Sequence, residues 1–260
     1  MPAALPGTLS AAAPVVARPA LSRSAPPVAP VGELAFPQVE RARLANGMEV
    51  VLARREGVPM VSLALVVAAG SAVDPAGREG MHETMVDLLT EGTATRSATE
   101  IAIAQEQLGS QLAASAGIET DTIALTTLTA NLAPSLELLA DVVRRPAFRA
   151  EDVERVREQR LAGIAQELAE PESIAARVFG PLAYGEGHPY AMAATGGRAE
   201  VIAALTPEEL AAEHARWFRP DLARITAVGD ITMPELLAGL EASFGDWQAS
   251  EAPPPAPAAA

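Results

Sequence analysis

The 260-residue sequence contains no cysteine, so disulfides, thiolate metal ligands and a cysteine nucleophile are excluded together. Histidine is nearly as scarce, because only His82, His188 and His214 could supply an imidazole ligand. The motifs for serine hydrolysis (G-x-S-x-G) and for phosphate binding (a Walker-type Gly-Lys-Ser/Thr) are also missing. A metal site in this chain would therefore have to be rich in oxygen ligands.

Positively charged residues are also few. Lysine and arginine together number 19 against 33 aspartates and glutamates, which gives a formal net charge of -14. Such a chain repels a nucleic-acid backbone or an anionic membrane surface, so neither is an expected partner. The longest apolar run, around residues 60–69, has about half of the roughly 20 residues that a membrane-spanning helix needs. We therefore expect no transmembrane segment.

Both ends of the chain are dominated by proline and alanine. This composition favours extended chain over a packed core, and we expect residues 1–37 and 249–260 to be disordered linkers. Hydrophobic residues make up 49% of the whole sequence, which is ample for a sizeable core. The folded domain is predicted over residues 38–248.

Local patterns inside this domain predict a mixture of hairpins and helices. Asn46-Gly47 lies between apolar runs and suits the tight turn of a β-hairpin. The β-branched run 61–67 is typical of a central strand, and we expect it to be buried on both faces. An apolar stripe with helical spacing follows at Met81, Met85, Leu88 and Leu89.

Helix-capping signals continue the pattern further along the chain. Ser97 with Glu100 forms a capping box, and Thr206 before Pro207 is a strong helix start. Strands do not alternate strictly with helices, so the predicted class is α+β, a mostly antiparallel sheet packed against helices. Further strands are expected over 111–116, 122–128 and 223–228, and further helices over 132–143, 150–169, a segment ending near 182, 206–218 and 233–244.

Seven short motifs occur in a characteristic order through the folded region. They are Leu44-Ala45-Asn46-Gly47-Met48, Ala69-Gly70-Ser71, Gly77-Arg78-Glu79-Gly80, Glu91-Gly92-Thr93, Gly187-His188-Pro189-Tyr190, Trp217-Phe218-Arg219-Pro220 and Val228-Gly229-Asp230. In this order they resemble the pitrilysin/insulinase family of zinc peptidases. The resemblance implies that family's fold and matches its first, N-terminal-type domain. Members pair such domains into halves that close like a clamshell around a peptide chamber.

In active relatives, the helix that follows the glycine-rich turn carries H-x-x-E-H. Residues at i and i+4 of a helix lie one above the other, so two imidazoles share one Zn²⁺ while the glutamate acts as general base. Aligning this chain on Gly80 places Glu83 and Asp87 at the histidine positions and Val86 at the position of the base. Starting from His82 instead gives a helix with neither a base nor a second ligand. The motif is degenerate, and the resemblance implies no catalytic residue.

The third zinc ligand of the family is a glutamate on a later helix, and Glu167 matches that position. Glu83, Asp87 and Glu167 are residual metal candidates, since three carboxylates suit Ca²⁺, Mg²⁺ or Mn²⁺ better than Zn²⁺. The alternative is that they are solvated or hydrogen-bonded carboxylates. We expect no cofactor in this chain, with zinc confined to active relatives. His188 is expected to make a loop hydrogen bond and His214 to lie at the surface or its boundary.

These features favour a catalytically silent domain of a metallopeptidase. Its expected partner is another domain of the family, in the same polypeptide or in a heterodimer, that keeps an intact H-x-x-E-H and shares in a peptide-binding chamber. Two alternatives stay open, an active metalloendopeptidase with unusual ligands and a structural assembly subunit, so whether the chain is an enzyme by itself is undecided. Exposed apolar surfaces would make the domain associate. The resemblance to bacterial envelope peptidases favours the periplasm, with the cytoplasm as the alternative.

Overall fold

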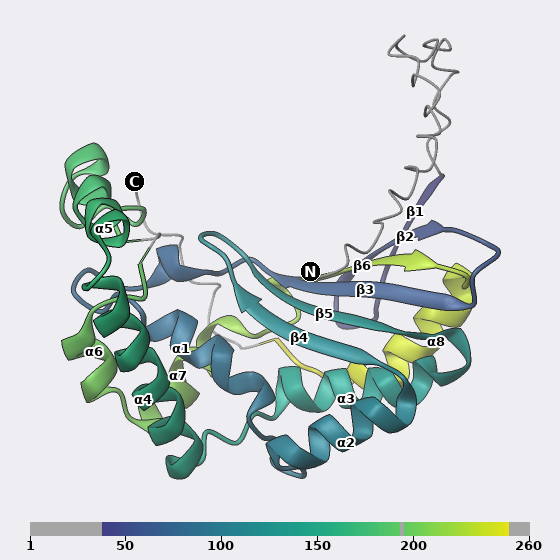
Figure 1. Ribbon diagram of the computed structural model, residues 1–260. Helices are drawn as coiled ribbons and strands as arrows, with labels where there is room; N and C mark the ends of the chain where they lie inside the picture. Colours follow the sequence, from purple (N-terminus) through teal and green to yellow (C-terminus); the bar gives the residue numbers. More distant parts are fainter. Residues whose placement is uncertain (1–37, 193–194, 250–260) are drawn as a thin grey trace, which may run out of the picture. The chain divides into compact units, whose positions relative to one another are not determined.

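The computed structural model describes residues 38–192 and 195–249 (Figure 1). The linkers predicted at 1–37 and 249–260 lie outside these residues except for Ala249. Six strands form one sheet in the order β1-β2-β6-β3-β5-β4. Their bounds are β1 (Val39–Arg43), β2 (Glu49–Arg54), β3 (Met60–Val67), β4 (Gln111–Ala116), β5 (Asp121–Leu128) and β6 (Ala223–Gly229).

Neighbouring strands run antiparallel except β2 and β6, which are parallel. The predicted α+β class is therefore confirmed, with a mostly antiparallel sheet and the following α-helices in the described part of the chain: α1 (Met81–Asp87), α2 (Ala98–Leu108), α3 (Leu132–Arg144), α4 (Ala150–Glu167), α5 (Pro171–Tyr184), α6 (Ala199–Ala204), α7 (Pro207–Trp217) and α8 (Met233–Phe244).

The local signals in the sequence act as predicted. The β1–β2 hairpin turns at Asn46-Gly47, where Gly47 has a φ of 92° that other residues avoid. Capping boxes begin α2 at Ser97 and α7 at Thr206. Pro171, for which the sequence analysis predicted no helix start, is the first residue of α5, where its missing N–H is not needed.

The sheet is covered by helices on one face, where α2, α3 and α8 lie (Figure 1). Strand β3 is central, but the prediction that it is buried on both faces is wrong. Val61, Leu63, Leu65 and Val67 are 0–3% exposed, whereas Met60 on the other face is 40% exposed. The strand has the alternation of a half-covered antiparallel sheet rather than the continuous burial of a parallel one.

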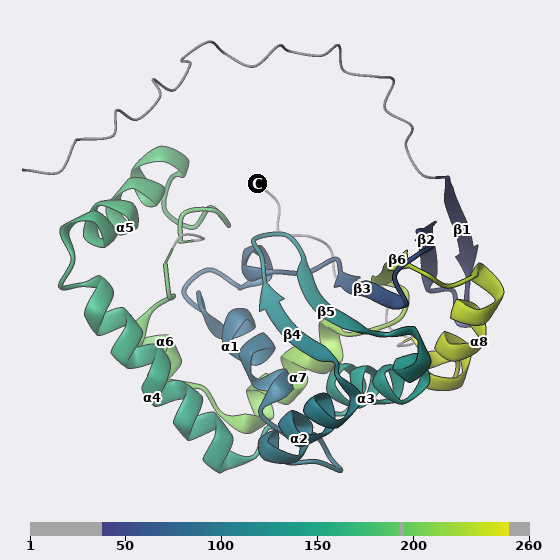
Figure 2. The ribbon, with the colours of Figure 1, turned by 45° about the vertical axis from the view of Figure 1, so that its right-hand side comes forward.

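Helix α1, which carries the degenerate motif, lies between the sheet and a second group of helices. It packs against β4 on one side and against α4, α6 and α7 on the others (Figure 2). Asp74 supplies its N-terminal cap, since the carboxylate accepts hydrogen bonds from the backbone N–H groups of Gly80 at 2.8 Å and His82 at 2.9 Å. Gly80 has a φ of 100° and its Cα lies so close to Gly197 that a side chain would crowd the loop before α6. The start of α1 is thus held in place from two sides.

Candidate functional site

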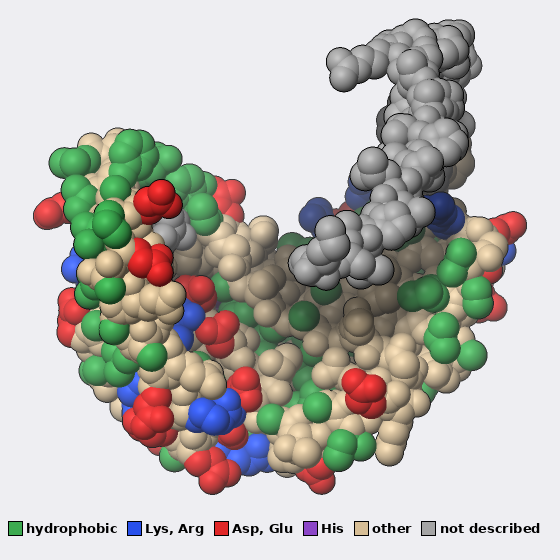
Figure 3. Space-filling view, in the orientation of Figure 1, with side chains coloured by type: hydrophobic (Ala, Val, Ile, Leu, Met, Phe, Trp, Pro, Cys, Tyr) green, Lys and Arg blue, Asp and Glu red, His purple; other side chains and the backbone are tan. Residues whose placement is uncertain are grey.

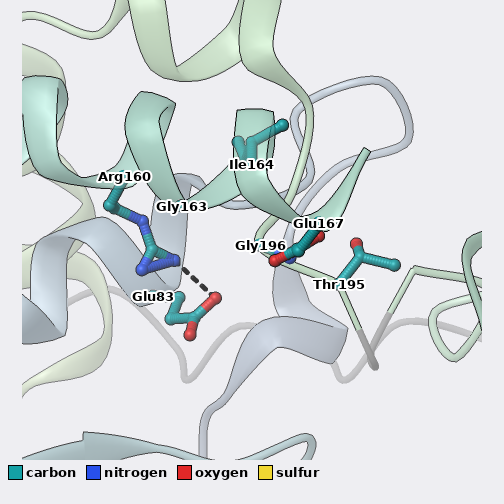
Figure 4. A pocket seen from close by; sticks show the side chains of 7 residues that line it. All are labelled: Glu83, Arg160, Gly163, Ile164, Glu167, Thr195 and Gly196. Carbon is teal, nitrogen blue, oxygen red and sulfur yellow. Dashed lines mark hydrogen bonds and ion pairs between the residues drawn. The ribbon is translucent and has the colours of Figure 1, made fainter. Parts of the chain in front are cut away.

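Glu83 and Asp87, the residues at the two histidine positions, lie one turn apart on α1. The guanidinium of Arg160, from α4, forms an ion pair with both of them and donates a hydrogen bond to Asp87. Its Nη2 lies 2.5 Å from Glu83 Oε2 and its Nη1 lies 2.8 Å from Asp87 Oδ2. Figure 4 shows the guanidinium of Arg160 and the carboxylate of Glu83 pointing toward each other. The side chain of Arg160 is only 12% exposed, against 36% for Glu83 and 40% for Asp87.

Val86, which the sequence motif predicts at the position of the catalytic base, is completely buried. It belongs to the hydrophobic core together with Met85 and Leu89. A valine side chain neither accepts nor donates a proton, so the group that would activate a water molecule for peptide hydrolysis is missing from this position.

Glu167, at the third ligand position, is engaged elsewhere. Its Oε2 accepts a hydrogen bond from Arg177 Nη1 at 2.7 Å, and its Oε1 accepts one from the backbone N–H of Gly196 at 3.1 Å. Gly196 approaches so closely that an added Cβ would lie 2.9 Å from Glu167 Oε1. Glu167 therefore anchors the chain on the way to α6 (Figure 4).

These residues do not fit the zinc ion that the family motif would hold. Glu83 and Asp87 on α1 face the guanidinium of Arg160, and Glu167 faces that of Arg177. The position predicted for the base holds Val86, an apolar core residue. Across residues 38–192 and 195–249, no group of three or more histidines, aspartates or glutamates is arranged to hold a metal ion. No catalytic step through a metal can be derived from this arrangement.

Arg160 separates two hollows in the surface between α1 and α4. The first has a volume of about 370 Å³ and the second about 330 Å³, and Arg160 belongs to the walls of both. Glu83 and Glu167 line the first, whereas Asp87 and Glu91 line the second. Burial raises the pKa of Asp87, and the neighbouring carboxylates of Glu83 and Glu91 act in the same direction, while Arg160 opposes them. The guanidinium is thus the cation that holds this acidic face together.

A second charged cluster, which sequence reasoning missed, lies on the core-facing side of α1. His82 is completely buried, with Nε2 2.7 Å from Asp121 Oδ2 of β5 and Nδ1 3.1 Å from Glu213 Oε1 of α7. A protonated imidazole can donate a hydrogen bond from each ring nitrogen, so this geometry suits the cationic form of His82. Burial lowers the pKa of His82, but hydrogen bonds to Asp121 and Glu213 prevail and raise it to about 9.

Asp74 lies close to this cluster, because its carboxylate caps the helix that bears His82. Burial raises the pKa of Asp74 to about 6, although the two backbone hydrogen bonds and the positive charge of His82 act to lower it. The rings of His82 and Trp217 form a T-shaped pair, with their centroids 6.4 Å apart. The cluster joins β5, α1 and α7 in the interior, and the side chains of His82, Asp121 and Glu213 are buried.

Of the other two histidines, His188 lies as predicted and His214 does not. His188 Nδ1 accepts the backbone N–H of Tyr190 at 3.1 Å, which is the expected loop hydrogen bond. His214 was expected at or near the surface, and this prediction is wrong because the side chain is buried. Its Nε2 donates to the carbonyl of Val143 at 2.9 Å, and burial lowers its pKa to about 4. It is a neutral core histidine packed on Phe218.

Comparison with protein families supports the resemblance seen in the motifs. Residues 49–182 match the model of the insulinase family (peptidase family M16), and residues 204–260 match that of the peptidase M16 inactive domain. An uncharacterized zinc protease of Mycobacterium tuberculosis is 30% identical over 205 residues, which cover 79% of this chain and 46% of that protein. A probable mitochondrial-processing peptidase subunit beta of Schizosaccharomyces pombe is 29% identical over 221 residues, covering 83% of this chain and 47% of that protein.

Solved structures agree with the family comparison. The peptidase M16 inactive domain from Pseudomonas fluorescens superimposes with a TM-score of 0.76 at 30% identity, covering 85% of this chain and 54% of that one. The chain spans about half the length of the curated relatives that it matches. In the described part of the chain, none of the helices has the length and apolar character needed to cross a membrane.

Proposed function

The chain belongs to the insulinase family of peptidases, peptidase family M16, and from this premise we propose that it is a catalytically silent domain. Its role would be to pair with an active half or subunit and to form part of the wall of a peptide-binding chamber. The partner would be a domain of the same family with an intact H-x-x-E-H, in the same polypeptide or in another subunit.

One observation carries the proposal of silence. The positions for the two histidines and the base hold Glu83, Asp87 and Val86, and Arg160 is bonded to both carboxylates. A peptidase of this family needs a Lewis-acidic metal and a proton acceptor beside the bound water. A guanidinium does not bind a water molecule as a Lewis acid does. It also accepts no proton from the water, because it stays protonated in proteins. A domain that only pairs with an active one needs the fold of the family but not its catalytic groups.

The exposed apolar face of α5 supports the pairing. Large hydrophobic side chains gather there, as the green surface over α5 in Figure 3 shows. Phe179 is 66% exposed and Leu182 is 80% exposed, and the neighbouring Ile174, Val178 and Tyr184 are 41–54% exposed. Contiguous exposed apolar side chains of this size are unusual on a monomer and typical of a surface that another protein covers. We propose that the paired family domain covers this face.

The silence of the domain is tested by metal content and cleavage together. The purified, chelator-free protein is assayed for bound zinc and for cleavage of an unstructured peptide, with Glu167→Ala beside the wild type. We expect no stoichiometric zinc and no cleavage in either protein. Stoichiometric zinc with metal-dependent cleavage that Glu167→Ala abolishes would replace this proposal with an active peptidase that uses unusual ligands.

The pairing is tested with a partner chain that carries H-x-x-E-H. Phe179→Ser together with Leu182→Ser is expected to weaken association, measured by sedimentation, and any stimulation of peptide cleavage by at least tenfold. Ile103→Ser on α2 is the matched control, since Ile103 is also exposed, at 50%, but lies away from α5. Association without any stimulation of cleavage would indicate an assembly subunit, and equal loss in the control would remove α5 from the proposal.

A further inference from the structure

Arg160 is placed where only a cation would be stable. Two carboxylates one helical turn apart on α1 repel each other, and no second arginine or histidine is bonded to either one in the described residues. The guanidinium reaches them from α4 and satisfies one oxygen of each. It also connects the two helices from which the ligands of a family metal site would come, because Glu167 lies on the same helix α4.

We propose that Arg160 takes the structural place of the metal ion, joining α1 to α4 through Glu83 and Asp87 and keeping divalent cations out of the site. On this proposal, positions 83 and 87 hold acidic residues in place of histidines because the cation that they face is the guanidinium of Arg160 and not a zinc ion. The fold of this domain is consequently independent of metal. It is Arg160, more than any lack of oxygen ligands, that excludes a metal ion.

The chemistry of the three side chains supports this exchange. A guanidinium keeps its charge at every pH at which proteins fold. Its Nη1 donates a hydrogen bond to Asp87, and its Nη2 forms an ion pair with Glu83. If Arg160 were neutral, two facing carboxylates would border a hollow of about 370 Å³ on one side and about 330 Å³ on the other. Mg²⁺ and Mn²⁺ accept one or two carboxylates with water as the remaining ligands, and both hollows have room for such water.

The test uses the full 260-residue chain with Arg160→Gln, which keeps much of the side chain and removes the charge. Thermal unfolding is followed in EDTA and in a Mn²⁺ titration, and bound Mn²⁺ is counted by the loss of the free-ion electron paramagnetic resonance signal. In EDTA, we expect Arg160→Gln to lower the unfolding temperature by roughly 3–6 °C. Mn²⁺ should restore at least half of that shift, with a dissociation constant on the order of 10⁻⁴ to 10⁻³ M, whereas the wild type should neither bind nor respond.

The matched control addresses the acidity of the protein, whose net charge of -14 attracts cations nonspecifically. Arg155, on the same helix, bridges Glu91 at 2.8 Å and Asp152 at 2.9 Å but is 42% exposed. Arg155→Gln should show no saturable response to Mn²⁺. An equal response in Arg155→Gln, or no response in Arg160→Gln, would overturn the proposal.

A second variant keeps the proposal testable if Arg160→Gln does not fold. Arg160→Lys retains a positive charge, so it should fold without metal and exclude Mn²⁺ as the wild type does; binding of Mn²⁺ by this variant would contradict the exchange of one cation for another. The inference rests on the proposed silence of the domain, but the two fail differently. Zinc with cleavage in the wild type would refute both, whereas an unresponsive Arg160→Gln would refute this inference alone.

Discussion

Helix α1 carries two charged clusters on different faces, and each places one cation between two carboxylates. On the core side, His82 lies between Asp121 and Glu213, with all three side chains at most 6% exposed. On the α4 side, Arg160 lies between Glu83 and Asp87, which are 36% and 40% exposed. The buried cluster joins three elements of the fold. The outer one joins two helices beside open hollows, at the positions that the sequence motif predicts for the metal ligands.

This difference in burial determines how much a substitution in each cluster should cost. A buried ion pair is a poor source of net stability, but it becomes indispensable once its partners are in place, because any charge left alone in the interior is costly. The outer cluster is partly solvated, so a change there is tolerated more easily. A substitution at the outer cluster should therefore disturb the fold less than one at the interior cluster.

Replacing His82 should have the largest effect. His82→Gln leaves Asp121 and Glu213 buried without a cation, and we expect a loss of about 3–5 kcal/mol in the free energy of unfolding. Urea unfolding followed by circular dichroism measures it. His188→Gln serves as the control and should cost less than about 0.5 kcal/mol. If His82→Gln were as stable as His188→Gln, the interior cluster would not be needed to stabilise the fold.

The interior cluster should also make stability depend on pH in the alkaline range. The pKa of His82 in the folded protein, about 9, lies above its ordinary value of 6.5, so the charged form is stabilised by folding. The contribution is complete below pH 6.5 and is lost as the pH rises through 9, by about 3 kcal/mol in total. Denaturant midpoints between pH 6.5 and 9.5 measure this loss, and His82→Gln should lack it.

Asp74 does not interfere in that range. Its pKa in the folded protein is raised to about 6, so its contribution is present below its ordinary value of 3.8 and is lost as the pH rises through 6. Asp121 and Glu213 face His82 from β5 and α7, and Asp74 is the further carboxylate near it. A wild-type profile that stayed flat above pH 7 would indicate that His82 is neutral and that the cluster is not an ion pair.

The outer cluster should show a smaller but specific coupling. In a double-mutant cycle with Glu83→Gln and Arg160→Gln, we expect a coupling energy of about 0.5–1.5 kcal/mol, because one partner is buried and the other is partly exposed. The pair Arg155 and Glu91 is the comparison, with an expected coupling of about 0.2–0.5 kcal/mol. Equal values for the two pairs would mean that Arg160 is an ordinary surface ion pair.

Sequence reasoning was sufficient wherever the interacting residues are close along the chain. Asn46-Gly47 turns a hairpin, and Ser97 and Thr206 cap helices, because these effects involve residues at most four positions apart. The burial of β3 was judged wrongly because an apolar run does not reveal how many faces of a sheet are covered. The small residues Ser62 and Ala64, which alternate with Val61, Leu63 and Leu65, were the signal of a half-exposed strand.

The sequence predicted the site residues on α1 but not their partners, because the partners are distant along the chain. Counting from Gly80 placed Glu83, Val86 and Asp87 on α1, but their partner Arg160 lies 73 residues beyond Asp87. His82 falls on the same apolar stripe as Met85 and Leu89, so its burial could have been inferred from the spacing. Its carboxylate partners are 39 and 131 residues away, and only the tertiary fold brings them together.

The smallest loss in the free energy of unfolding is expected at Glu167, which lies on α4 with Arg160 but outside both clusters. Glu167→Gln keeps an amide oxygen for the backbone N–H of Gly196 and loses only the charge facing Arg177, whose partner carboxylate is 31% exposed. We expect a loss of about 0.5 kcal/mol, measured by urea unfolding. Arg177→Gln should cost at least as much, because Arg177 is the other half of the same pair and also donates a hydrogen bond to the carbonyl of Gly197. A loss above about 2 kcal/mol in Glu167→Gln with no matching loss in Arg177→Gln would mean that this carboxylate has a partner other than Arg177, and a bound cation would then be the first candidate.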